Sequence, residues 1–135
     1  MSFKNLKKNI YQGYVQLTEF NNIYLPTPIQ NLIMKNFCDQ NNAIFKLSVN
    51  EHYIKNCYME LFFILKKINK IDGLIMSSIY MLPQDKKNFS YFVKLYKKRK
   101  LKIIFIFENQ EVKNSKELLL IYKKYSQYKS LNQIV

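Results

Sequence analysis

Residues that support metal binding, cross-linking and loop-rich folds are scarce in this chain of 135 residues. The sequence has 2 Gly and 3 Pro, which excludes collagen-like chains and scaffolds made mainly of loops. With 2 Cys and 1 His, it lacks the ligands of a zinc site and the side chains of a standard Cys/His or Ser/His/Asp centre. We therefore expect no bound metal and no cofactor.

Long apolar segments are missing too. No run of 18 or more apolar residues occurs, so no membrane-spanning helix is expected. Residues 1–9 are polar and rich in lysine, without the apolar stretch that a secretory signal needs. Cys38 and Cys57 have no metal-ligand spacing and are expected to be free thiols. Together these features predict a cytoplasmic protein in a reducing compartment.

A net charge of +13 is the strongest compositional feature, from 22 Lys and Arg against 9 Asp and Glu. Arg99 is the only arginine, and abundant Asn, Ile, Tyr and Phe accompany the lysines, a profile typical of A/T-rich codon usage. Such a chain attracts polyanions at low salt. Because proteins that read nucleic-acid sequence rely on arginine, specific nucleic-acid binding is not expected. Residues 86–102 hold eight basic side chains and no acid, which fits either a solvated helix face or a phosphate-binding patch.

The 48% hydrophobic content predicts a folded chain, and the length fits one domain over residues 1–135. We expect a polar, lysine-rich lead over residues 1–11 and a C-terminal helix and tail over residues 114–135. Between them strands alternate with helices, which predicts right-handed crossovers. The fold class is therefore α/β with three layers, a four-stranded, mostly parallel sheet with helices on both faces. The expected strands are residues 13–18, 43–49, 74–79 and 101–107, and the expected helices begin near residues 27, 56, 85 and 114.

Polar residues suited to helix caps precede three of the apolar helical patterns, and two of these starts have the spacing of a capping box. The predicted caps are Thr27 with Gln30, Asp85, and Asn114 with Glu117. Helical periodicity then predicts which side chains face the sheet. They are Ile29, Leu32, Ile33 and Phe37 in the first helix, and Phe89, Phe92, Val93 and Tyr96 in the third.

Ligands of parallel α/β sheets bind beyond the carboxyl ends of the strands, where the strand order reverses. A site is therefore expected in one or more of the loops at residues 18–24, 48–56, 77–85 and 108–112.

Cys57 lies near a predicted helix start, where backbone N–H groups favour a thiolate, and Glu51 or His52 could act as its base. The alternative is a buried Cys57 with Glu51 as a capping acid.

Hydroxyl groups and one acid follow the later strands. Ser77, Ser78 and Tyr80 could bind a polar ligand such as a sugar, or could satisfy the backbone of the bend before Pro83. Glu108 could be a ligand-binding acid or a solvated loop acid.

The segments Cys57-Tyr58-Met59 and Ser78-Ile79-Tyr80-Met81-Leu82-Pro83 are the most distinctive motifs of the chain. They resemble the sporadic carbohydrate cluster family over roughly residues 12–112, together with Gly13-Tyr14, Pro28-Ile29-Gln30-Asn31-Leu32, Phe37-Cys38, Leu47-Ser48 with Glu51 and Tyr53, Asp72-Gly73 and Glu108. This resemblance implies a small bacterial protein of cell-surface carbohydrate biosynthesis or modification that binds a sugar or nucleotide-sugar. The expected ligand-binding residues are Gln30, Asn31, Ser48, Tyr53, Tyr58, Ser77, Ser78, Tyr80 and Glu108.

A more distant resemblance is to the catalytic domain of serine recombinases, also called resolvases. The segment from Gly13 to Thr18 resembles the first strand of that family, with Thr18 in place of the nucleophilic serine and Gln16 in place of a catalytic arginine. Strand exchange needs several arginines to stabilise the transferring phosphate, and this chain has only Arg99. The resemblance therefore implies the fold and argues against strand exchange.

The residues leave open whether the protein is an enzyme. If it is, Glu51 is the expected acid or base, and Cys57 or Thr18 the expected nucleophile. One alternative function is a non-catalytic module that binds nucleic acid through its lysines. Another is an interaction subunit that forms a homo-oligomer or docks onto a biosynthetic enzyme, because the last helix carries more apolar side chains than one face can bury.

Overall fold

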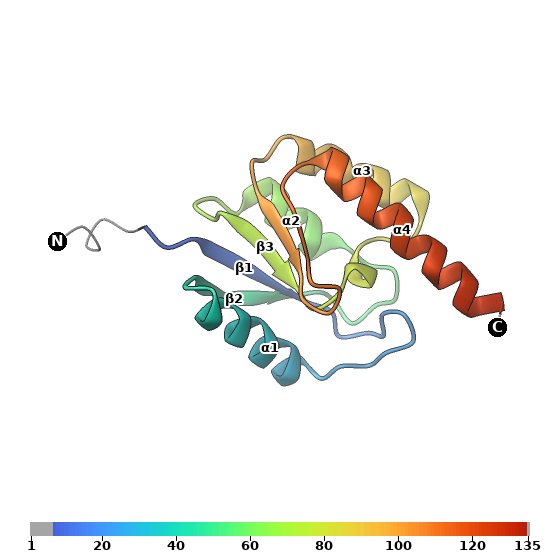
Figure 1. Ribbon diagram of the computed structural model, residues 1–135, viewed down its shortest axis with the longest axis horizontal. Coiled ribbons are helices and arrows are strands. Elements are labelled where there is room, and N and C mark those ends of the chain that lie inside the picture. Colours follow the sequence, from blue (N-terminus) through green and yellow to red (C-terminus); the bar gives the residue numbers. More distant parts are fainter. Residues whose placement is uncertain (1–6, 135) are drawn as a thin grey trace.

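The computed structural model describes residues 7–134, with side chains for residues 7–128. The chain alternates strands with helices, as the sequence predicts, and Figure 1 shows the resulting arrangement. In order, the elements are β1 (Ile10–Val15), α1 (Thr27–Gln40), β2 (Ile44–Asn50), α2 (Met59–Lys67), β3 (Gly73–Met76), the short 3₁₀ turn η2 (Ile79–Met81), α3 (Lys86–Lys97), β4 (Lys102–Phe105), β5 (Gln110–Val112) and α4 (Ser115–Ile134).

The described strands form one five-stranded sheet in the order β2-β1-β3-β4-β5. β1 pairs in parallel with both β2 and β3, and β3 pairs in parallel with β4. The prediction of four strands was wrong by one, because β5 folds back antiparallel to β4. β5 has three residues and a single apolar one, Val112, which is too short a pattern to identify a strand from sequence.

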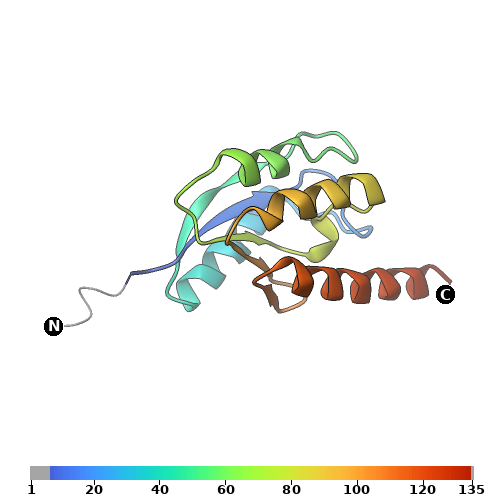
Figure 2. The ribbon, with the colours of Figure 1, turned by 90° about the horizontal axis from the view of Figure 1, so that it is seen from above.

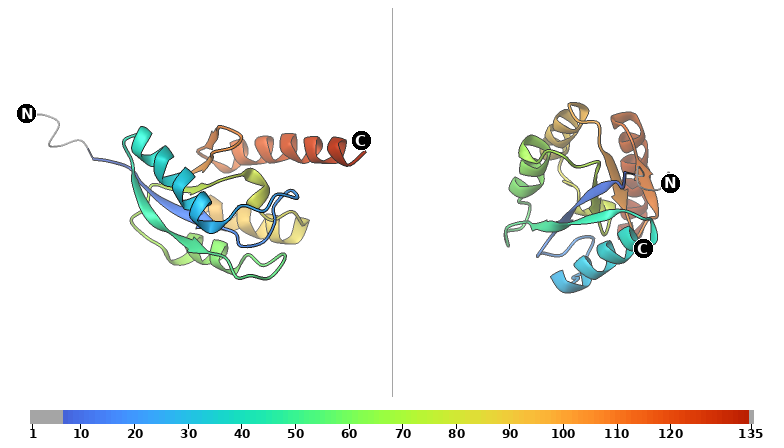
Figure 3. Two further views of the ribbon diagram at one scale, coloured as in Figure 1. Left: turned by 90° about the horizontal axis from the view of Figure 1, so that it is seen from below. Right: turned by 90° about the vertical axis from the view of Figure 1, so that its left-hand side faces the viewer.

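Helices cover both faces of the sheet, which confirms the three-layer α/β class (Figure 3). The larger core lies under α2 and α3 and includes Leu61, Leu74, Phe92 and Ile103. The smaller core lies under α1, on the opposite face. Leu118 anchors α4 to the larger core, and Figure 2 shows α4 running alongside α3 and extending past it.

Of the four side chains predicted to face the sheet from α1, Phe37 packs against the smaller core and Ile33 is half-buried, but the prediction was wrong for Ile29 and Leu32 of this helix. Its fully buried residues are Gln30, Met34 and Cys38, whereas Leu32 is 65% exposed and Ile29 is 42% exposed. The packed face of this helix is therefore marked by Met34 and Cys38 together with the polar Gln30, and not by Ile29 and Leu32. The predicted capping box is also absent, since α1 begins after Pro26 without a side-chain cap and Thr27 is its first residue.

Two other helix starts follow their predictions. Asp85 accepts a hydrogen bond from the Asn88 N–H group at 2.9 Å and caps α3. At the start of α4, Asn114 accepts from the Glu117 N–H group at 2.9 Å, and the Glu117 carboxylate accepts from the Lys113 N–H group at 2.8 Å. The four side chains predicted to face inward from α3 are all buried: Phe89, Phe92, Val93 and Tyr96.

A β-bulge shapes the edge strand β2. The pairing register with β1 shifts between Gln12 and Tyr14, so that β2 contributes one extra residue there. Gly13 lies at this point, where a Cβ atom would come within 2.6 Å of the Phe45 ring. β1 itself begins at Ile10 and ends at Val15, so it starts inside the predicted lead and leaves Thr18 in the following loop.

Candidate functional site

A polar recess of about 270 Å³ lies at the carboxyl edge of the sheet. It is formed by the loops that follow β1, β2 and β3, and the strand order reverses at β1. Three of the four loops predicted to form a site therefore meet here, while residues 108–112 do not line the recess. Its lining side chains are Gln16, Thr18, Glu19, Phe20, Asn21, Asn22, Lys55, Asn56, Cys57, Tyr58, Tyr80 and Gln84.

Two asparagines shape the loop after β1. Asn21 and Asn22 have positive φ angles of 51° and 61°. Phe20 and Ile23 exchange backbone hydrogen bonds of 3.0 and 2.9 Å across them, which closes a tight turn. Asparagine adopts this left-handed backbone more readily than most residues with a side chain. The turn brings both asparagine side chains into the lining of the recess.

Gln30 of α1 holds the two ends of the same loop. Its side-chain amide is fully buried and donates to the carbonyl oxygens of Gln16 at 2.8 Å and Leu25 at 2.7 Å. A buried glutamine that bridges two loop carbonyls explains why α1 places a polar residue against the sheet. Gln30 thus supports the recess from behind, without lining it.

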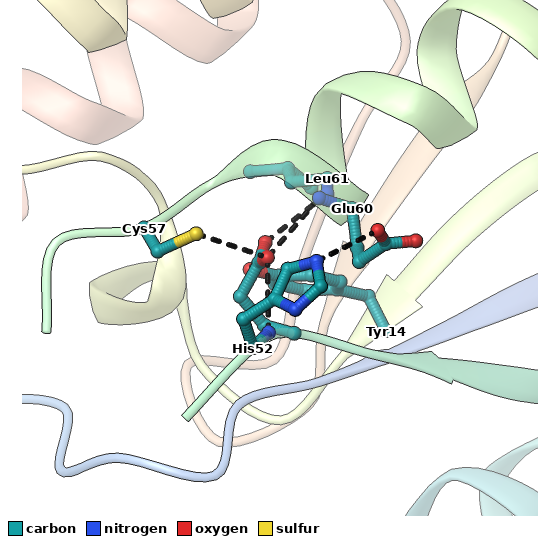
Figure 4. Close-up of polar contacts among 6 residues, drawn as sticks. Tyr14, His52, Cys57, Glu60 and Leu61 are labelled. Carbon is teal, nitrogen blue, oxygen red and sulfur yellow. Dashed lines mark hydrogen bonds and ion pairs between the residues drawn. The ribbon is translucent and has the colours of Figure 1, made fainter. Parts of the chain in front are cut away.

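The loop after β2 is organised around the carboxylate of Glu51, which is only 3% exposed. One carboxylate oxygen accepts hydrogen bonds from the Tyr14 hydroxyl at 2.8 Å and the Leu61 N–H group at 3.2 Å. The other accepts from the N–H groups of Glu60 at 3.1 Å and His52 at 3.2 Å (Figure 4). Glu51 therefore binds the N-terminal turn of α2, where backbone N–H groups lack helical partners and favour an anion.

Cys57 and Tyr14 contact the same carboxylate from two sides (Figure 4). The Cys57 thiol lies 3.7 Å from Glu51 Oε2, and this cysteine is partly exposed in the recess. Burial, followed by the negative charge of Glu51, raises the pKa of Tyr14 well above its usual value. The Tyr14 hydroxyl thus keeps its proton and donates a hydrogen bond to the carboxylate.

Ser78 and Glu108 fix the loop after β3. The Ser78 hydroxyl caps η2 by accepting from the Tyr80 N–H group at 3.2 Å, and it donates to Glu108 at 2.8 Å. The other Glu108 oxygen accepts from the Ile79 N–H group at 2.8 Å. For Ser78 these contacts match the structural alternative, the satisfaction of the bend ahead of Pro83. Glu108 is instead a partly buried acid that holds this bend, and not the solvated loop acid of the alternative interpretation. Tyr80 lines the recess, and its hydroxyl donates to the Tyr125 carbonyl of α4 at 3.0 Å.

The lining of the recess is polar and carries little net charge. Lys55 is the only cation and Glu19 the only acid among the residues that line it. The other polar groups are mainly side-chain amides and hydroxyls. Burial raises the pKa of Tyr58 and of Tyr80, so both phenols stay neutral. A neutral lining of amides, hydroxyls and aromatic rings is suited to a polar, uncharged ligand group.

A wider recess of about 660 Å³ adjoins the first one. The two share Thr18, Glu19 and Lys55. The wider recess adds the side chains of Tyr24, which is 62% exposed, and Tyr53, which is 74% exposed. A ligand with two units could therefore occupy both recesses, with Lys55 near the junction.

The structure separates the predicted site residues into three groups. Thr18, Cys57, Tyr58 and Tyr80 line the recess, and Tyr53 lines the adjoining one. Glu51, Ser78, Glu108 and Gln30 lie behind the lining and hold its loops. Elsewhere, Ser48 contacts Asn50 at 3.4 Å, and the buried side-chain oxygens of Asn31 and Ser77 have no hydrogen-bond partner in the described structure.

Sequence reasoning missed the amides of the recess. Gln16, Asn21, Asn22, Asn56 and Gln84 all belong to its lining. The Asn21-Asn22 pair carried a usable signal, since an asparagine pair between apolar residues is typical of a tight turn. Asparagine is so frequent in this chain that the pair did not stand out.

Among residues 7–128, no group of three or more His, Cys, Asp or Glu side chains could hold a metal ion. In the part of the chain that the structure describes, no helix is long and apolar enough to cross a membrane. Arg99, the only arginine of the chain, lies away from the recess and donates to the carbonyl oxygens of Ile64, Leu65 and Ile68 at the end of α2.

The fold is similar to a solved structure, the N-terminal catalytic domain of TP901-1 integrase, a serine recombinase. The superposition has a TM-score of 0.66 and covers 93% of this chain and 99% of that domain, at 10% sequence identity. This likeness confirms the resolvase-like fold. Because the sequence identity is only 10%, it shows nothing beyond the fold. No family model matches the sequence, and the comparison with curated proteins gives no match. The resemblance to the sporadic carbohydrate cluster family has no support from these comparisons.

Proposed function

We propose that this protein binds a sugar or a nucleotide-linked sugar at the carboxyl edge of its sheet, in bacterial cell-surface carbohydrate biosynthesis or modification. The observation that carries the proposal is the recess of about 270 Å³ at the reversal of strand order, lined by amides and hydroxyls. The choice of ligand class is taken from the sequence resemblance to the sporadic carbohydrate cluster family, and it is part of the proposal.

The chemistry of the lining supports a polyhydroxylated ligand. Each side-chain amide offers donors and an acceptor, and each hydroxyl offers both, so the lining can match the mixed hydrogen bonding of sugar hydroxyls. Tyr80, which is partly exposed, adds ring surface for the apolar face of a sugar. A substrate phosphate that reacts by strand exchange would instead need several arginines, and none lines this recess.

The adjoining recess supports a ligand with a second unit. Tyr24 and Tyr53 present exposed rings there, on which a nucleobase could stack. Lys55 lines both recesses and is placed to contact a phosphate that links the two units. A nucleotide-linked sugar combines these three chemical features in one molecule.

Catalytic roles for Cys57 and Thr18 belong to this proposal, since both side chains line the recess. Glu51 lies behind Cys57, and both of its oxygens already accept hydrogen bonds from protein donors. We therefore propose that Glu51 positions Cys57 and the start of α2, and that it is not the group that exchanges protons with a ligand.

Isothermal titration at moderate salt tests the proposal, with UDP-glucose, glucose 1-phosphate and glucose as probes. Thr18→Val removes one hydroxyl from the shared lining, and Lys55→Gln removes its only cation. Lys46→Gln is the matched control, because Lys46 is exposed on β2 and lies outside both recesses.

We expect at least one probe to bind, and a lost hydrogen bond of about 1.4 kcal/mol to weaken its Kd about tenfold in Thr18→Val. Lys55→Gln should weaken the phosphorylated probes and leave glucose unchanged. Absence of binding by all three probes, or equal losses in Lys55→Gln and Lys46→Gln, would contradict the proposal.

A second candidate is a non-catalytic module that binds nucleic acid or another protein. The recombinase-like fold and the +13 charge favour nucleic acid, in which case DNA affinity should fall steeply with salt and with charge removal at Lys97, Lys98 and Lys100. The exposed side chains of Leu119 and Leu120 on α4 favour a protein contact. Light scattering after size-exclusion chromatography tests for a homo-oligomer.

A further inference from the structure

A separate recess of about 540 Å³ lies at the opposite edge of the sheet, where β1, β3 and β4 begin. Its walls come from segments that are far apart in the sequence. Asn9 precedes β1 and Asp72 precedes β3. Lys97 ends α3, residues 99–102 lead into β4, and residues 113–115 follow β5. Because β5 runs antiparallel to β4, its end returns to this edge of the sheet (Figure 1). The amino-edge recess shares no lining residue with the carboxyl-edge recess.

Five cationic side chains line the amino-edge recess: Lys97, Arg99, Lys100, Lys102 and Lys113. The only acid in its lining is Asp72, and a carboxylate oxygen of Asp72 accepts from the Ile10 N–H group at 2.8 Å. The lysine-rich sequence segment therefore does not lie along one solvated helix face. The fold gathers part of it, together with Lys113, around a concave surface.

Two of the five cations have protein partners. Arg99 donates to three carbonyl oxygens at the end of α2, at 2.6, 2.6 and 3.3 Å. Lys102 forms an ion pair with Glu111 at 3.2 Å, and the hydrogen bond that Lys102 donates to Glu111 raises the pKa of Lys102. Lys97, Lys100 and Lys113 are exposed, and no acidic side chain pairs with any of them in the described part of the chain.

Three unpaired lysines around one recess repel one another, and a bound anion would relieve that repulsion. The volume of the recess lies within the range of small-molecule sites, about 300–1,000 Å³. A single carboxylate would neutralise only one of the three charges, whereas a diphosphate carries several negative charges and many acceptor oxygens. Asn9, Asn114 and Ser115 add neutral hydrogen-bonding groups to the same lining.

We propose that the amino-edge recess is an anion site that binds a diphosphate or longer phosphate group, held by Lys97, Lys100 and Lys113. This site is independent of the proposed sugar site, because the two lie at opposite edges of the sheet. The shared chemistry is the phosphate anion, which a small ligand would supply as a diphosphate and a nucleic-acid backbone as successive phosphodiesters.

Isothermal titration with inorganic pyrophosphate, at low and at physiological salt, tests this proposal on the full chain. The pocket variant is Lys100→Gln with Lys113→Gln. The control is Lys87→Gln with Lys123→Gln, which removes the same net charge from two exposed lysines outside the recess. All four lysines are exposed, and thermal unfolding of each variant verifies the fold.

We expect pyrophosphate to bind at physiological salt, with a Kd weakened more than tenfold in the pocket variant and within about threefold in the control. Equal weakening in both variants would show attraction to net charge alone and would overturn the site. Absence of binding at physiological salt would overturn it as well. Neither result would bear on UDP-glucose binding at the other edge.

A second titration distinguishes the two sources of phosphate, with a short thymidine oligonucleotide added to the pyrophosphate complex. If the oligonucleotide displaces pyrophosphate, and if the pocket variant binds the oligonucleotide more weakly, the result would support a nucleic-acid backbone as the phosphate source. Retention of pyrophosphate would support a small phosphorylated ligand. Oligonucleotide binding that persists unchanged in the pocket variant, without pyrophosphate binding, would overturn the proposal.

Discussion

Replacing Glu51 with glutamine isolates the structural role of its carboxylate, because the substitution keeps the shape of the side chain. Each carboxylate oxygen accepts at least two hydrogen bonds, from the Tyr14 hydroxyl and Leu61 on one side and from Glu60 and His52 on the other. In Glu51→Gln, one of these oxygens becomes an NH₂ group. Whichever way the amide turns, its NH₂ group replaces an oxygen that accepts two hydrogen bonds and faces at least one backbone N–H donor.

The expected loss of stability follows from those contacts. A hydrogen bond to a charged group contributes about 1.5–3 kcal/mol, and a buried donor left without an acceptor costs about 1–3 kcal/mol. Loss of two such bonds predicts a decrease of about 3–5 kcal/mol in the free energy of unfolding. For a domain of this size, each kcal/mol lowers Tm by about 3–5 °C, so we expect a fall of about 10–20 °C.

Thermal unfolding followed by circular dichroism measures this change, with Glu60→Gln as the matched control. Glu60 pairs with His52 at 3.1 Å, but both side chains are partly exposed, at 30% and 49%. Exposed ion pairs contribute about 0–1 kcal/mol, so the control should lower Tm by about 5 °C or less. If Glu51→Gln and Glu60→Gln lower Tm equally, the assignment of Glu51 as the anchor of α2 is wrong.

Three further predictions concern groups away from that anchor. In the native protein, two guanidinium nitrogens of Arg99 donate to two carbonyl oxygens at the end of α2, and a lysine cannot make both contacts. Arg99→Lys should therefore lower the free energy of unfolding in urea by about 1–3 kcal/mol. An unchanged urea midpoint would refute this prediction. Ellman's reagent at pH 8 should label the partly exposed Cys57 in the native protein. Cys38 is fully buried, and burial raises its pKa to about 11, so it should react only after unfolding. A fast phase of labelling that remains in Cys57→Ser would contradict this prediction. Burial raises the pKa of Tyr96 to about 12 in the folded protein. The unfolded chain therefore loses the Tyr96 proton near pH 10, whereas the folded protein keeps it. The stability that is present below pH 10 should consequently be lost as the pH rises toward 12. The slope of stability against pH above 10, from urea midpoints, should be shallower in Tyr96→Phe, and an unchanged slope would rule out this contribution.

Much of the fold could be predicted because periodicity and packing agree in several elements. In α3, the residues spaced at helical intervals are those that pack on the sheet, and Asp85 supplies the cap. In α1, the two disagree, because Leu32 faces solvent while Gln30 faces the sheet and bridges loop carbonyls. The pattern of hydrophobic residues in a sequence does not predict a buried side chain that serves as a hydrogen-bond donor, such as Gln30. β5 was missed for a different reason, since three residues hold too little pattern.

The site was predictable in position and much less so in its members. The rule that ligands bind beyond the carboxyl ends of parallel strands selected the loops that contain Thr18, Lys55 and Tyr80. The direction of each side chain depends on the backbone of its loop, as the positive φ angles of Asn21 and Asn22 show. The roles of other candidate residues depend on contacts between segments that are far apart in the sequence. For this reason the sequence left two interpretations of Glu51, and the structure assigns it five donor contacts around α2.

The most direct test of the account is to map the backbone amide resonances of the ¹⁵N-labelled protein during titration with UDP-glucose. The proposed sugar site predicts that the largest chemical-shift changes fall in residues 16–24, 53–58 and 80–84, which line the two adjoining recesses. Changes confined to residues 97–102 and 113–115, or no changes at all, would contradict a sugar site at the carboxyl edge of the sheet.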